Sequence, residues 1–436
     1  IYKIKVLKFG GTSVGSVANM KKVAEIVRRE QARITVLSAM SGTTDSLVRI
    51  SRAAASGDRN AIEEQLAMLT DKYTRCIEEL LRERKQQALA RMNATFGLIR
   101  DEAAAFEEYE SERKIIAQGE LLTSAIFTAY LQETGLKAEC LYSPDFMVKD
   151  PGEKVDTERI GRALARVAGD DSTFFVAQGF ICSDSQGRID NLGRGGSDYS
   201  AALMGAAVEA AEVQIWTDID GMHNNDPRFV DNTRPIRTMS FDEAAELAYF
   251  GAKILHPATI QPCKDHGIAV LLKNTMDPEA PGTTISNRDD DTKSFHAVAA
   301  KDGITVIRIH SARMLMAYGF LRKVFEIFEQ YRTPIDMITT SEVAVSLTVD
   351  NDSHIDEIVR DLSALGSIEI ERGNSIVCVV GRMEHGDAGL AARVFECVRG
   401  VPIKMISYGA SHRSLAILID TEHKKRTLQC LNDGLF

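Results

Sequence analysis

The sequence predicts an α/β fold followed by two small ferredoxin-like modules, and three observations support this prediction. Strand-like and helix-like segments alternate through the N-terminal two-thirds of the chain, starting with an apolar run at 2–9, a Gly-Gly turn and an amphipathic stretch at 17–31. A polar stretch at 277–293, with two prolines and three consecutive aspartates, interrupts this alternation. Beyond it, one strand–helix–strand–strand pattern occurs twice. The order of strand, glycine loop and helix is typical of sheets that bind ligands at the carboxyl ends of their strands.

The N-terminal two-thirds contains the elements of one large α/β unit. The stretch at 58–106 is rich in Ala, Leu, Glu, Arg and Lys at helical spacing, so it predicts two or three helices with a solvated charged face. A further helix is expected at 112–134, closed by Gly135. Short apolar and β-branched runs predict the remaining strands and one hairpin, at 34–39, 138–142, 173–177, 180–189, 213–217 and 269–273.

The C-terminal third contains an internal repeat. Residues 319–338 and 389–406 each hold a Val-Phe-Glu triplet followed by a Pro-Ile pair at nearly the same distance. A β run precedes and follows each copy, and a further helix is expected after each, at about 354–365 and 421–431. Each copy therefore has the order of elements of a ferredoxin-like βαββαβ module.

Composition excludes several classes of protein. The chain has 436 residues, which suggests two to four domains at roughly 100–200 residues each. The 44% of hydrophobic residues are ample for packed cores, and a net charge of −10 argues against non-specific nucleic-acid binding. Seven cysteines, none spaced as CxxC, argue against a disulfide framework or a thiolate zinc site. Neither a membrane span of roughly 18 apolar residues nor a signal peptide is found, so a soluble cytoplasmic protein is expected.

Two glycine-rich turns are candidates for anion binding. The first, KFGGTS at 8–13, lies where the first strand gives way to a helix. Its glycines let backbone N–H groups approach a phosphate, the helix N-terminus adds a positive dipole end, and Lys8 supplies an ammonium. The motif is neither a Walker A loop nor a Rossmann fingerprint. From these residues alone, a phosphate site and a plain structural turn both remain open.

The second turn, NLGRGGSD at 191–198, also leads into a helix. Arg194 can bind a carboxylate or a phosphate with two parallel hydrogen bonds. Ser197 and Asp198 lie at the helix start, where Asp198 could equally be a plain capping residue. Three glycines and an arginine so close together favour a binding loop over a bare turn.

Four further segments carry weaker signals. TDIDG at 217–221 follows an apolar strand, a usual place for aspartates that hold Mg²⁺ or a ribose, although Asp-Gly turns are common anyway. Lys253, in GAKILHP, could neutralise charge on a transferring phosphoryl group, although a single lysine is usually a surface residue. SAMSGTT at 38–44 closes the second strand with small hydroxyl residues that suit a small polar substrate. Glu120 lies within a predicted helix, where a lone glutamate normally faces solvent.

Together these segments resemble the aspartate kinase family. The pattern of that family is followed, in order and spacing, by KFGGTS, SAMSGTT, the Gly-Glu pair at 119–120, GRGGSD, TDIDG and GAKILHP. Its regulatory region is matched by MITTSE at 337–342 and SYGAS at 407–411. The resemblance covers essentially the whole chain.

The resemblance implies an amino acid kinase domain, an αβα sandwich, over residues 1–290, followed by two ACT modules. The first module would span 302–372 and bind an effector, and it would be inserted within the second, formed by 295–301 and 373–436. The implied reaction transfers a phosphoryl group from ATP, with Mg²⁺, to L-aspartate, giving 4-phospho-L-aspartate for lysine, threonine and methionine synthesis. A homodimer or a dimer of dimers, paired through ACT modules, is also implied.

The resemblance also implies a role for each motif residue. Lys8 and Lys253 would stabilise the transferring phosphoryl group, and Asp198 would orient these lysines. The aspartate would be held by Ser38, Thr44, Glu120, Arg194 and Ser197, with Arg194 on the α-carboxylate. The nucleotide would be lined by Lys8, Gly10, Gly11, Thr217, Asp218, His223, Arg228, Lys253 and Ile254, and no metal ligand is assigned. This division suits phosphoryl transfer, which depends mostly on positioning and charge neutralisation.

An amino-acid effector site is expected in the first ACT module. The candidate residues are Met314, Ala317, Gly319, Phe320, Leu321, Asp336, Thr340, Ser341 and Glu342. The N–H groups of the helix after Gly319 could receive an α-carboxylate, and Asp336 and Glu342 could receive two ammonium groups. Two acidic side chains favour lysine over threonine as the effector. The alternative is that these acids only cap and solvate a turn.

Some residues depart from the family pattern, and two other functions remain open. His223 stands where a tyrosine is usual, and Ala317 stands where lysine-responsive members frequently have a serine, so adenine stacking and one effector hydrogen bond are in question. The chain ends at Phe436 with no fused dehydrogenase, which indicates a monofunctional enzyme. The alternatives are another amino acid kinase, such as a glutamate or carbamate kinase, and a non-catalytic effector-binding protein.

Overall fold

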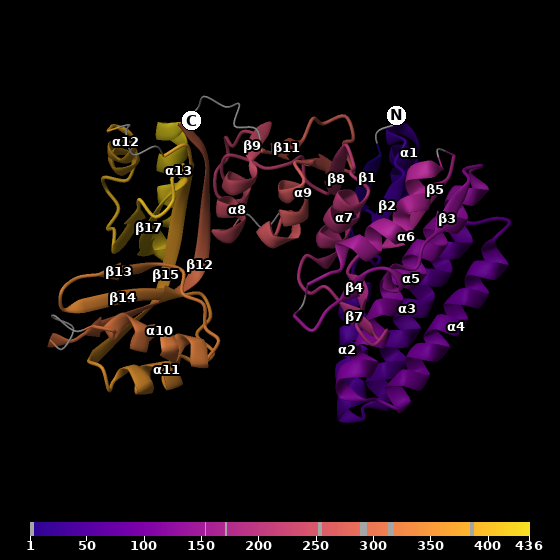
Figure 1. Cartoon of the computed structure of the whole chain (residues 1–436), viewed down its shortest axis with the longest axis horizontal. Helices are drawn as coiled ribbons and strands as arrows, with labels where there is room; N and C mark the ends of the chain where they lie inside the picture. The colour runs from indigo at the N-terminus through magenta and orange to yellow at the C-terminus, as the bar shows by residue number, and fades with distance from the viewer. Residues whose placement is uncertain are drawn as a thin grey trace. The chain divides into compact units, whose positions relative to one another are not determined.

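The computed structural model describes residues 4–152, 154–170, 172–251, 255–287, 294–312, 318–383 and 388–436. They divide into two compact units, which Figure 1 colours along the chain. The N-terminal unit contains Ile1–Met222, Arg237–Phe241 and Leu255–Asp289, and the C-terminal unit contains His223–Ile236, Asp242–Ile254 and Asp290–Phe436. Two short segments from the middle of the chain therefore pack with the C-terminal unit, whereas the family pattern predicts one domain over 1–290.

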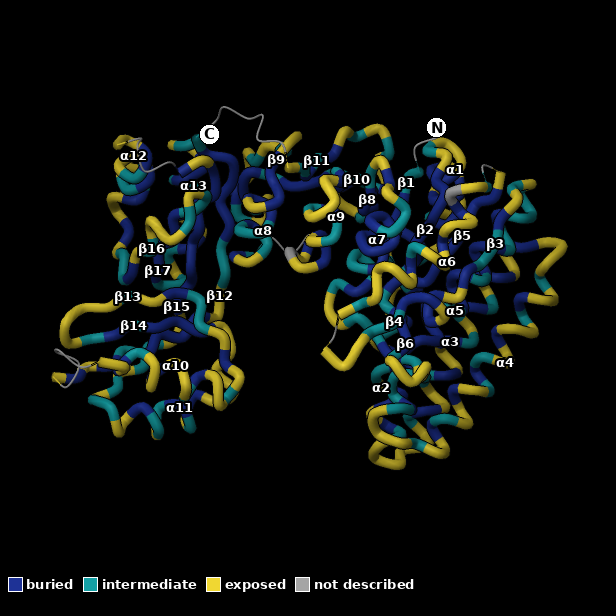
Figure 2. Tube along the Cα trace, in the orientation of Figure 1, coloured by how far each residue is buried: buried dark blue, intermediate teal, exposed yellow. Residues whose placement is uncertain are grey.

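An eight-stranded sheet forms the centre of the N-terminal unit. In order across the sheet, its strands are β3 (Ala138–Cys140), β5 (Phe174–Gln178), β2 (Ile34–Leu37), β1 (Lys5–Phe9), β8 (Glu212–Thr217), β10 (Ala269–Asn274), β11 (Thr283–Ser286) and β9 (Thr238–Ser240). Neighbouring strands are parallel except for the antiparallel pair β10 and β11. Strands β2, β5 and most of β1 are buried (Figure 2), which explains their continuous apolar sequences.

Helices cover both faces of this sheet. One face shares a hydrophobic core with α1 (Val17–Glu30), α2 (Thr43–Ser56), α3 (Arg59–Leu80), α4 (Lys85–Ala104) and α5 (Glu108–Glu133). Because side chains alternate along a strand, Phe9 points into this core and Lys8 points to the opposite face. On that face α7 (Gly196–Ala207) contacts β1, β2 and β8, and it packs on α6 (Thr157–Gly169) and α9 (Gln261–Asp265). The αβα sandwich is thus confirmed.

Local sequence signals begin several of these helices. The Ser16 side chain accepts the Asn19 N–H at the start of α1, and the Asp58 side chain accepts the Ala61 N–H at the start of α3. Gly42 and Gly195 instead adopt left-handed backbone conformations directly before α2 and α7, with φ of 76° and 72°. Both turns depend on glycine, because other residues rarely adopt this conformation.

A small three-stranded sheet completes the N-terminal unit. It consists of β4 (Val148–Lys149), β6 (Ile181–Asp184) and β7 (Ile189–Asn191), and β6 and β7 form the hairpin expected at 180–189. Two single-turn 3₁₀ helices lie at Ser143–Asp145 and Pro257–Thr259. In the described parts of both units, no helix is long and apolar enough to cross a membrane.

The C-terminal unit is built on one six-stranded antiparallel sheet. In order, its strands are β13 (Ile338–Thr340), β14 (Ala344–Val349), β12 (Phe295–His310), β15 (Ser367–Gly381), β17 (Ser414–Asp420) and β16 (Met405–Tyr408). Strands β12 and β15 pair along nearly their whole length. Residues 295–301 of β12 pair with 376–381, and residues 304–310 pair with 367–374. One pair of long strands therefore serves both copies of the repeat.

Each copy of the repeat has its own hydrophobic core. Helices α10 (Phe320–Gln330) and α11 (Ile355–Leu362) pack on β14 and the second half of β12. Helices α12 (Leu390–Cys397) and α13 (Lys424–Leu435) pack on β17 and the first half of β12, in a core that also contains Val230 and Phe295. Burial of Val230 here explains why the segment at 223–236 belongs to this unit. Helix α8 (Phe241–Tyr249) and a 3₁₀ turn at Thr421–His423 complete the described elements.

Candidate functional site

The KFGGTS turn lies at the end of β1, near the middle of the large sheet. Lys8 Nζ lies 2.7 Å from Asp198 Oδ1, and the two side chains are only 11% and 13% exposed. Asp198 lies in the first turn of α7, where the helix dipole favours a negative charge. One ion pair therefore joins the two glycine-rich turns that the sequence singles out.

The SAMSGTT segment closes against this turn because β1 and β2 are parallel neighbours. The Ser38 N–H donates to the Phe9 carbonyl at 3.1 Å. A Cβ atom on Gly11 would lie 2.9 Å from the Ala39 carbonyl oxygen, so this close approach requires glycine. The Ser38 hydroxyl donates to Ser197 Oγ at 3.0 Å. Three segments that are distant in sequence therefore meet at one edge of the sheet.

A cavity of about 320 Å³ lies at this meeting point and is lined by Lys8, Ser38, Thr44, Glu120, Phe180, Gly193, Gly195, Gly196, Ser197 and Asp198. Of the residues predicted for catalysis and for aspartate binding, six share this cavity. Its wall carries one ammonium, two carboxyl groups and three hydroxyl groups. Such a wall suits a small ligand that bears both an ammonium and acidic groups.

Glu120 is the most unusual side chain of the cavity. It lies on α5 and is only 3% exposed, although a lone glutamate in a helix normally faces solvent. Its Oε1 accepts the Ala39 N–H at 3.2 Å, while its Oε2 has no hydrogen-bond partner within the described part of the chain. Burial raises the pKa of Glu120 to about 7. A ligand's ammonium group would supply the missing partner and favour the ionised carboxylate.

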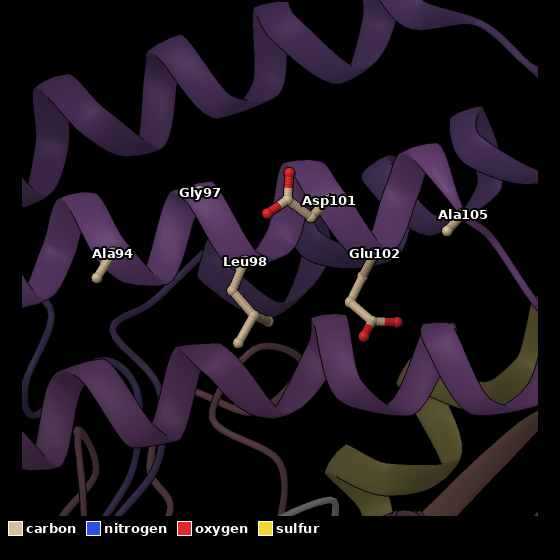
Figure 3. Close-up of a pocket in the computed structure, with 6 residues that line it drawn as sticks. All are labelled: Ala94, Gly97, Leu98, Asp101, Glu102 and Ala105. Carbon is tan, nitrogen blue, oxygen red and sulfur yellow. The ribbon is translucent and has the colours of Figure 1, made fainter.

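A larger hollow elsewhere in the N-terminal unit lacks this chemistry. It measures about 530 Å³ and is lined by Ala94, Gly97, Leu98, Asp101, Glu102 and Ala105. Figure 3 shows Leu98 and Glu102 pointing to one side of α4 and Asp101 to the other. Glu102 is engaged by the Ser111 hydroxyl and lies 3.4 Å from Lys114 Nζ. Because the charged lining residues are both acidic, the hollow on α4 would repel a phosphate, and the smaller cavity is the better candidate.

The GRGGSD loop forms the outer wall of the small cavity. Gly193 and Gly195 both have a φ of 72°, and a Cβ atom on Gly195 would lie 2.7 Å from Thr259 Cγ2. The glycines thus allow the loop to turn tightly and to pack closely. Arg194 is exposed and is not among the residues that line the cavity. Its neighbours Gly193 and Gly195 do line the cavity, so Arg194 lies beside it.

Phe180 lines the cavity but is not among the predicted residues. It follows β5 and has a φ of 68°, which is unusual for a residue other than glycine. Its N–H donates to Ser200 Oγ at 3.0 Å, and its carbonyl accepts the Leu192 N–H at 2.8 Å. The only sequence signal for Phe180 is its place at the end of a strand beside other loops of the site.

Two of the residues predicted for the nucleotide lie next to the glycine turn. Thr217 ends β8, and the preceding residue, Trp216, accepts the Gly10 N–H at 3.3 Å. The Thr217 hydroxyl lies 3.3 Å from the Ile219 N–H, and Asp218 is exposed. The ends of β1 and β8 therefore present Gly10, Thr217 and Asp218 at one place.

The remaining residues predicted for the nucleotide, apart from those of the glycine turn, belong to the C-terminal unit or lie outside the described residues. His223 and Arg228 belong to the C-terminal unit. His223 Nδ1 lies 3.0 Å from Thr233 Oγ1, and the Arg228 guanidinium forms two-pronged hydrogen bonds with the Asp226 carboxylate. Lys253 and Ile254 lie outside the described residues.

The predicted effector residues lie mainly around β13 and α10. Gly319 precedes α10 with a φ of 79°, whereas Phe320 and Leu321 pack into the core of this repeat copy. The exposed effector candidates are Thr340, Ser341 and Glu342. Met314 and Ala317 lie outside the described residues.

Asp336 is held by groups of the chain itself. Its side chain is only 2% exposed, and Oδ1 accepts hydrogen bonds from the Tyr249 hydroxyl at 2.8 Å and from Lys301 Nζ at 2.9 Å. Lys301 Nζ also lies 2.8 Å from Asp350 Oδ2. Asp336 Oδ2 has no hydrogen-bond partner among the described residues. One oxygen of Asp336 therefore serves an internal ion pair, and the other is unsatisfied.

These features define a class of protein. A central strand that ends in a glycine turn beside a buried Lys–Asp pair suits phosphoryl transfer to a small charged acceptor, and the ferredoxin-like modules form a separate unit. Family models match both parts: a model described as "Amino acid kinase family" matches residues 3–274, and one described as "ACT domain" matches residues 377–435.

Comparison with known proteins narrows the class. Lysine-sensitive aspartokinase 3 of Escherichia coli (strain K12) is 34% identical, over 100% of this chain and 99% of the relative. Aspartokinase 1, chloroplastic, of Arabidopsis thaliana is 32% identical, over 99% of this chain and 80% of the relative. The crystal structure of E. coli aspartokinase III with aspartate and ADP (R-state) covers both chains fully with a TM-score of 0.86 at 32% identity, and its complex with lysine and aspartate (T-state) gives 0.84. The chain belongs to the aspartokinase family, whose members are ATP-dependent kinases of aspartate.

Proposed function

We propose that the chain transfers the γ-phosphoryl group of ATP to the side-chain carboxylate of L-aspartate and forms 4-phospho-L-aspartate. This reaction would be the first step in the synthesis of lysine, threonine and methionine. The observation that carries the proposal is the single cavity lined by both Lys8 and Glu120, whose Oε2 is unpaired. One side of the cavity can neutralise a phosphoryl group while another holds the ammonium of an amino acid.

Lys8 would neutralise the charge that develops on the transferring phosphoryl group. Asp198 holds its ammonium before any substrate binds, and a preorganised cation needs no reorganisation during the reaction. The backbone N–H groups of Gly10 and Gly11 would contact phosphate oxygens of ATP, and Lys253 would be the second cation. No general base is required, because a carboxylate acceptor is already ionised at pH 7.

Aspartate would bind in the cavity with its ammonium on Glu120. The unpaired Oε2 would accept a hydrogen bond from that ammonium. The hydroxyl groups of Ser38, Thr44 and Ser197 would donate to the ligand's carboxylates. Arg194, between two glycines of the cavity wall, would bind the α-carboxylate through two parallel hydrogen bonds, which a planar guanidinium makes more readily than an ammonium.

ATP would lie along the ends of β1 and β8, on Gly10, Thr217 and Asp218. The family resemblance assigns Arg228, His223, Lys253 and Ile254 to the nucleotide as well. The described residues contain no group of three or more His, Cys, Asp or Glu side chains placed to hold a metal. Mg²⁺ in kinase sites is usually bound through substrate phosphates with one or two carboxylates, so it would enter with ATP, and Asp218 has suitable donor oxygens.

Lysine would inhibit the enzyme by binding to the first ACT module. The N–H groups at the start of α10 would receive its α-carboxylate, and the exposed Glu342, with Thr340 and Ser341 beside it, would receive an ammonium. The E. coli relative has been solved with lysine, which supports this choice of effector. The edge strands β13 and β16 carry the exposed Ile338 and Ile406, which supports pairing of two chains through these modules.

The test measures ADP release by the purified chain with MgATP and each of a panel of acceptors that includes aspartate, glutamate and carbamate. Turnover is expected with aspartate, and hydroxylamine should trap the product as the hydroxamate of the side-chain carboxyl group. Millimolar lysine should lower this turnover. Preferred turnover with glutamate or carbamate would contradict the acceptor, and no turnover with any of them would favour a non-catalytic effector-binding protein.

A further inference from the structure

A buried hydrogen-bond network lies behind the wall of the aspartate cavity. Helix α5 approaches the SAMSGTT segment so closely that a Cβ atom on Gly119 would lie 2.8 Å from Ala39 Cβ. Two backbone N–H groups of the segment donate to side chains of α5: Ala39 to Glu120 Oε1 and Met40 to Thr123 Oγ1, both at 3.2 Å. The segment and α5 are therefore connected at two successive residues.

Tyr73, on α3, makes a third connection between the same two elements. Its hydroxyl oxygen lies 3.1 Å from Thr43 Oγ1 and 3.2 Å from Thr123 Oγ1, and the side chain is fully buried. Burial raises the pKa of Tyr73 to about 12, so the phenol keeps its proton at neutral pH. A neutral phenol can donate to one threonine hydroxyl and accept from the other.

The two threonines lie directly behind residues of the cavity wall. Thr43 precedes Thr44, at the first turn of α2, and Thr123 lies one helical turn after Glu120 on α5. Thr44 and Glu120 both line the cavity, whereas Tyr73 is not among the lining residues. Each hydrogen-bond partner of the Tyr73 hydroxyl is therefore close in sequence to a residue that would touch the ligand: Thr43 is next to Thr44, and Thr123 is one helical turn from Glu120.

We infer that Tyr73 is a positioning residue for aspartate: its hydroxyl fixes the spacing between Thr44 and Glu120 by bridging Thr43 to Thr123. The inference rests on the proposed roles of Glu120 and Thr44. The neighbouring Lys72 supports the same segment from outside, because its Nζ donates to the Ser41 carbonyl and lies 3.4 Å from Thr43 Oγ1. The Tyr73 hydroxyl is connected through its two threonine partners to Thr44 and Glu120, so its loss should act mainly on the binding of the amino acid.

The ring and the hydroxyl of Tyr73 can be separated by substitution. The ring packs edge-on against Phe96, with centroids 6.0 Å apart, in the core shared by α1–α5. Tyr73→Phe keeps this packing and removes only the hydroxyl. Thr43→Val removes the partner hydroxyl with little change of volume and serves as a second, independent variant.

The experiment measures KM for aspartate, KM for ATP and kcat of the full chain. Tyr73→Phe and Thr43→Val should each raise KM for aspartate about three- to tenfold, the range expected for loss of one hydrogen bond, while kcat and KM for ATP stay within about twofold. The double variant should show no further increase, because both substitutions break the same bridge. Tyr130→Phe, at a half-buried position of α5 that does not line the cavity, is the matched control and should behave as wild type.

Glu120→Gln distinguishes a failure of the inference about Tyr73 from a failure of the proposed aspartate site. If Glu120→Gln raises KM for aspartate but Tyr73→Phe and Thr43→Val do not, Tyr73 has no positioning role. The inference would also be overturned if Tyr73→Phe and Thr43→Val lowered kcat and raised KM for aspartate and KM for ATP to the same extent. Such a result would indicate general damage to the fold. If Glu120→Gln itself leaves KM unchanged, the proposed aspartate site is wrong.

Discussion

Lys8 and Asp198 form a nearly buried ion pair, with Nζ 2.7 Å from Oδ1, across two turns that are far apart in the sequence. Removing one member of such a pair leaves the other charge uncompensated, which is costly when water is excluded. The pair therefore fixes the ammonium of Lys8 at the end of β1 even before a ligand arrives. Its position on the cavity wall makes Lys8 the first residue to test.

Lys8→Ala should lower kcat by on the order of 10²–10³, as loss of one preorganised stabiliser of transition-state charge typically does. KM for aspartate should change less, because the ammonium acts mainly on the phosphoryl group. Lys253→Ala is expected to have a similar effect. Steady-state kinetics with ADP release measures both, and Lys22→Ala, which removes an exposed lysine of α1, is the control. If Lys8→Ala or Lys253→Ala keeps nearly full kcat, that lysine does not stabilise the transferring phosphoryl group.

Arg194→Lys should mainly raise KM for aspartate, because a planar fork is replaced by a point charge that cannot bind a carboxylate through two parallel bonds. KM for ATP should stay within a few-fold. The exposed Arg188 of the neighbouring hairpin offers a matched control, since Arg188→Lys makes the same change away from the cavity. A rise confined to KM for ATP would instead place Arg194 at the nucleotide.

The affinity for aspartate should depend on pH through Glu120. Burial raises the pKa of this carboxyl to about 7, so the free enzyme holds it neutral below that pH and ionised above it. Only the ionised form pairs with an ammonium, whereas the carboxylates of aspartate stay ionised throughout. KM for aspartate should therefore rise as the pH falls from about 8 to about 6.

Glu120→Gln supplies the comparison for this pH profile. A glutamine has no charge to lose, so KM for aspartate should be high at every pH and nearly flat. A wild-type KM that does not change between pH 6 and 8, or a variant with the wild-type slope, would show that another group causes the dependence.

The local signals of the sequence predict most elements of the N-terminal unit, since each depends on residues close together in the chain. Apolar runs predict the buried strands of the sheet, and glycine turns predict the loops that meet at Lys8. The cavity is harder to predict from residue patterns, because Ser38, Glu120 and Ser197 come together only through strand order. Residue patterns indicated the segments that contain Ser38 and Ser197, the family resemblance added Glu120, and the structure brings all three to one wall.

Tyr73 and Phe180 illustrate what residue patterns do not reveal. Tyr73 lies in a helix full of charged and apolar residues, and its hydroxyl gains a role only because α5 and the start of α2 pack on α3. The segment at 223–236 likewise joins the C-terminal unit because Val230 is buried in the same core as Phe295. Such contacts join residues that are dozens of positions apart, so the local spacing of apolar residues in the sequence cannot predict them.

Asp336 already binds groups of the chain itself, which changes how the effector site should be tested. The acid is expected to bind an effector's ammonium, but its Oδ1 already accepts hydrogen bonds from Lys301 and from the Tyr249 hydroxyl. Tyr249 ends α8, four residues before Lys253 in the sequence. An Asp336→Ala variant would therefore lose an internal ion pair together with any contact to the effector. Glu342, which is exposed, is the cleaner residue to change.

Glu342→Ala should relieve inhibition by lysine while leaving the uninhibited kcat nearly unchanged. Loss of a coupling of typical size corresponds to an increase of about five- to 150-fold in the lysine concentration that halves activity. Glu329→Ala removes another exposed acid of the same module and is the control. Lysine titrations of ADP release, combined with calorimetry of lysine binding, distinguish lost binding from lost coupling. If wild-type activity is indifferent to millimolar lysine but falls with threonine, lysine is the wrong effector, even though the kinase assignment stands.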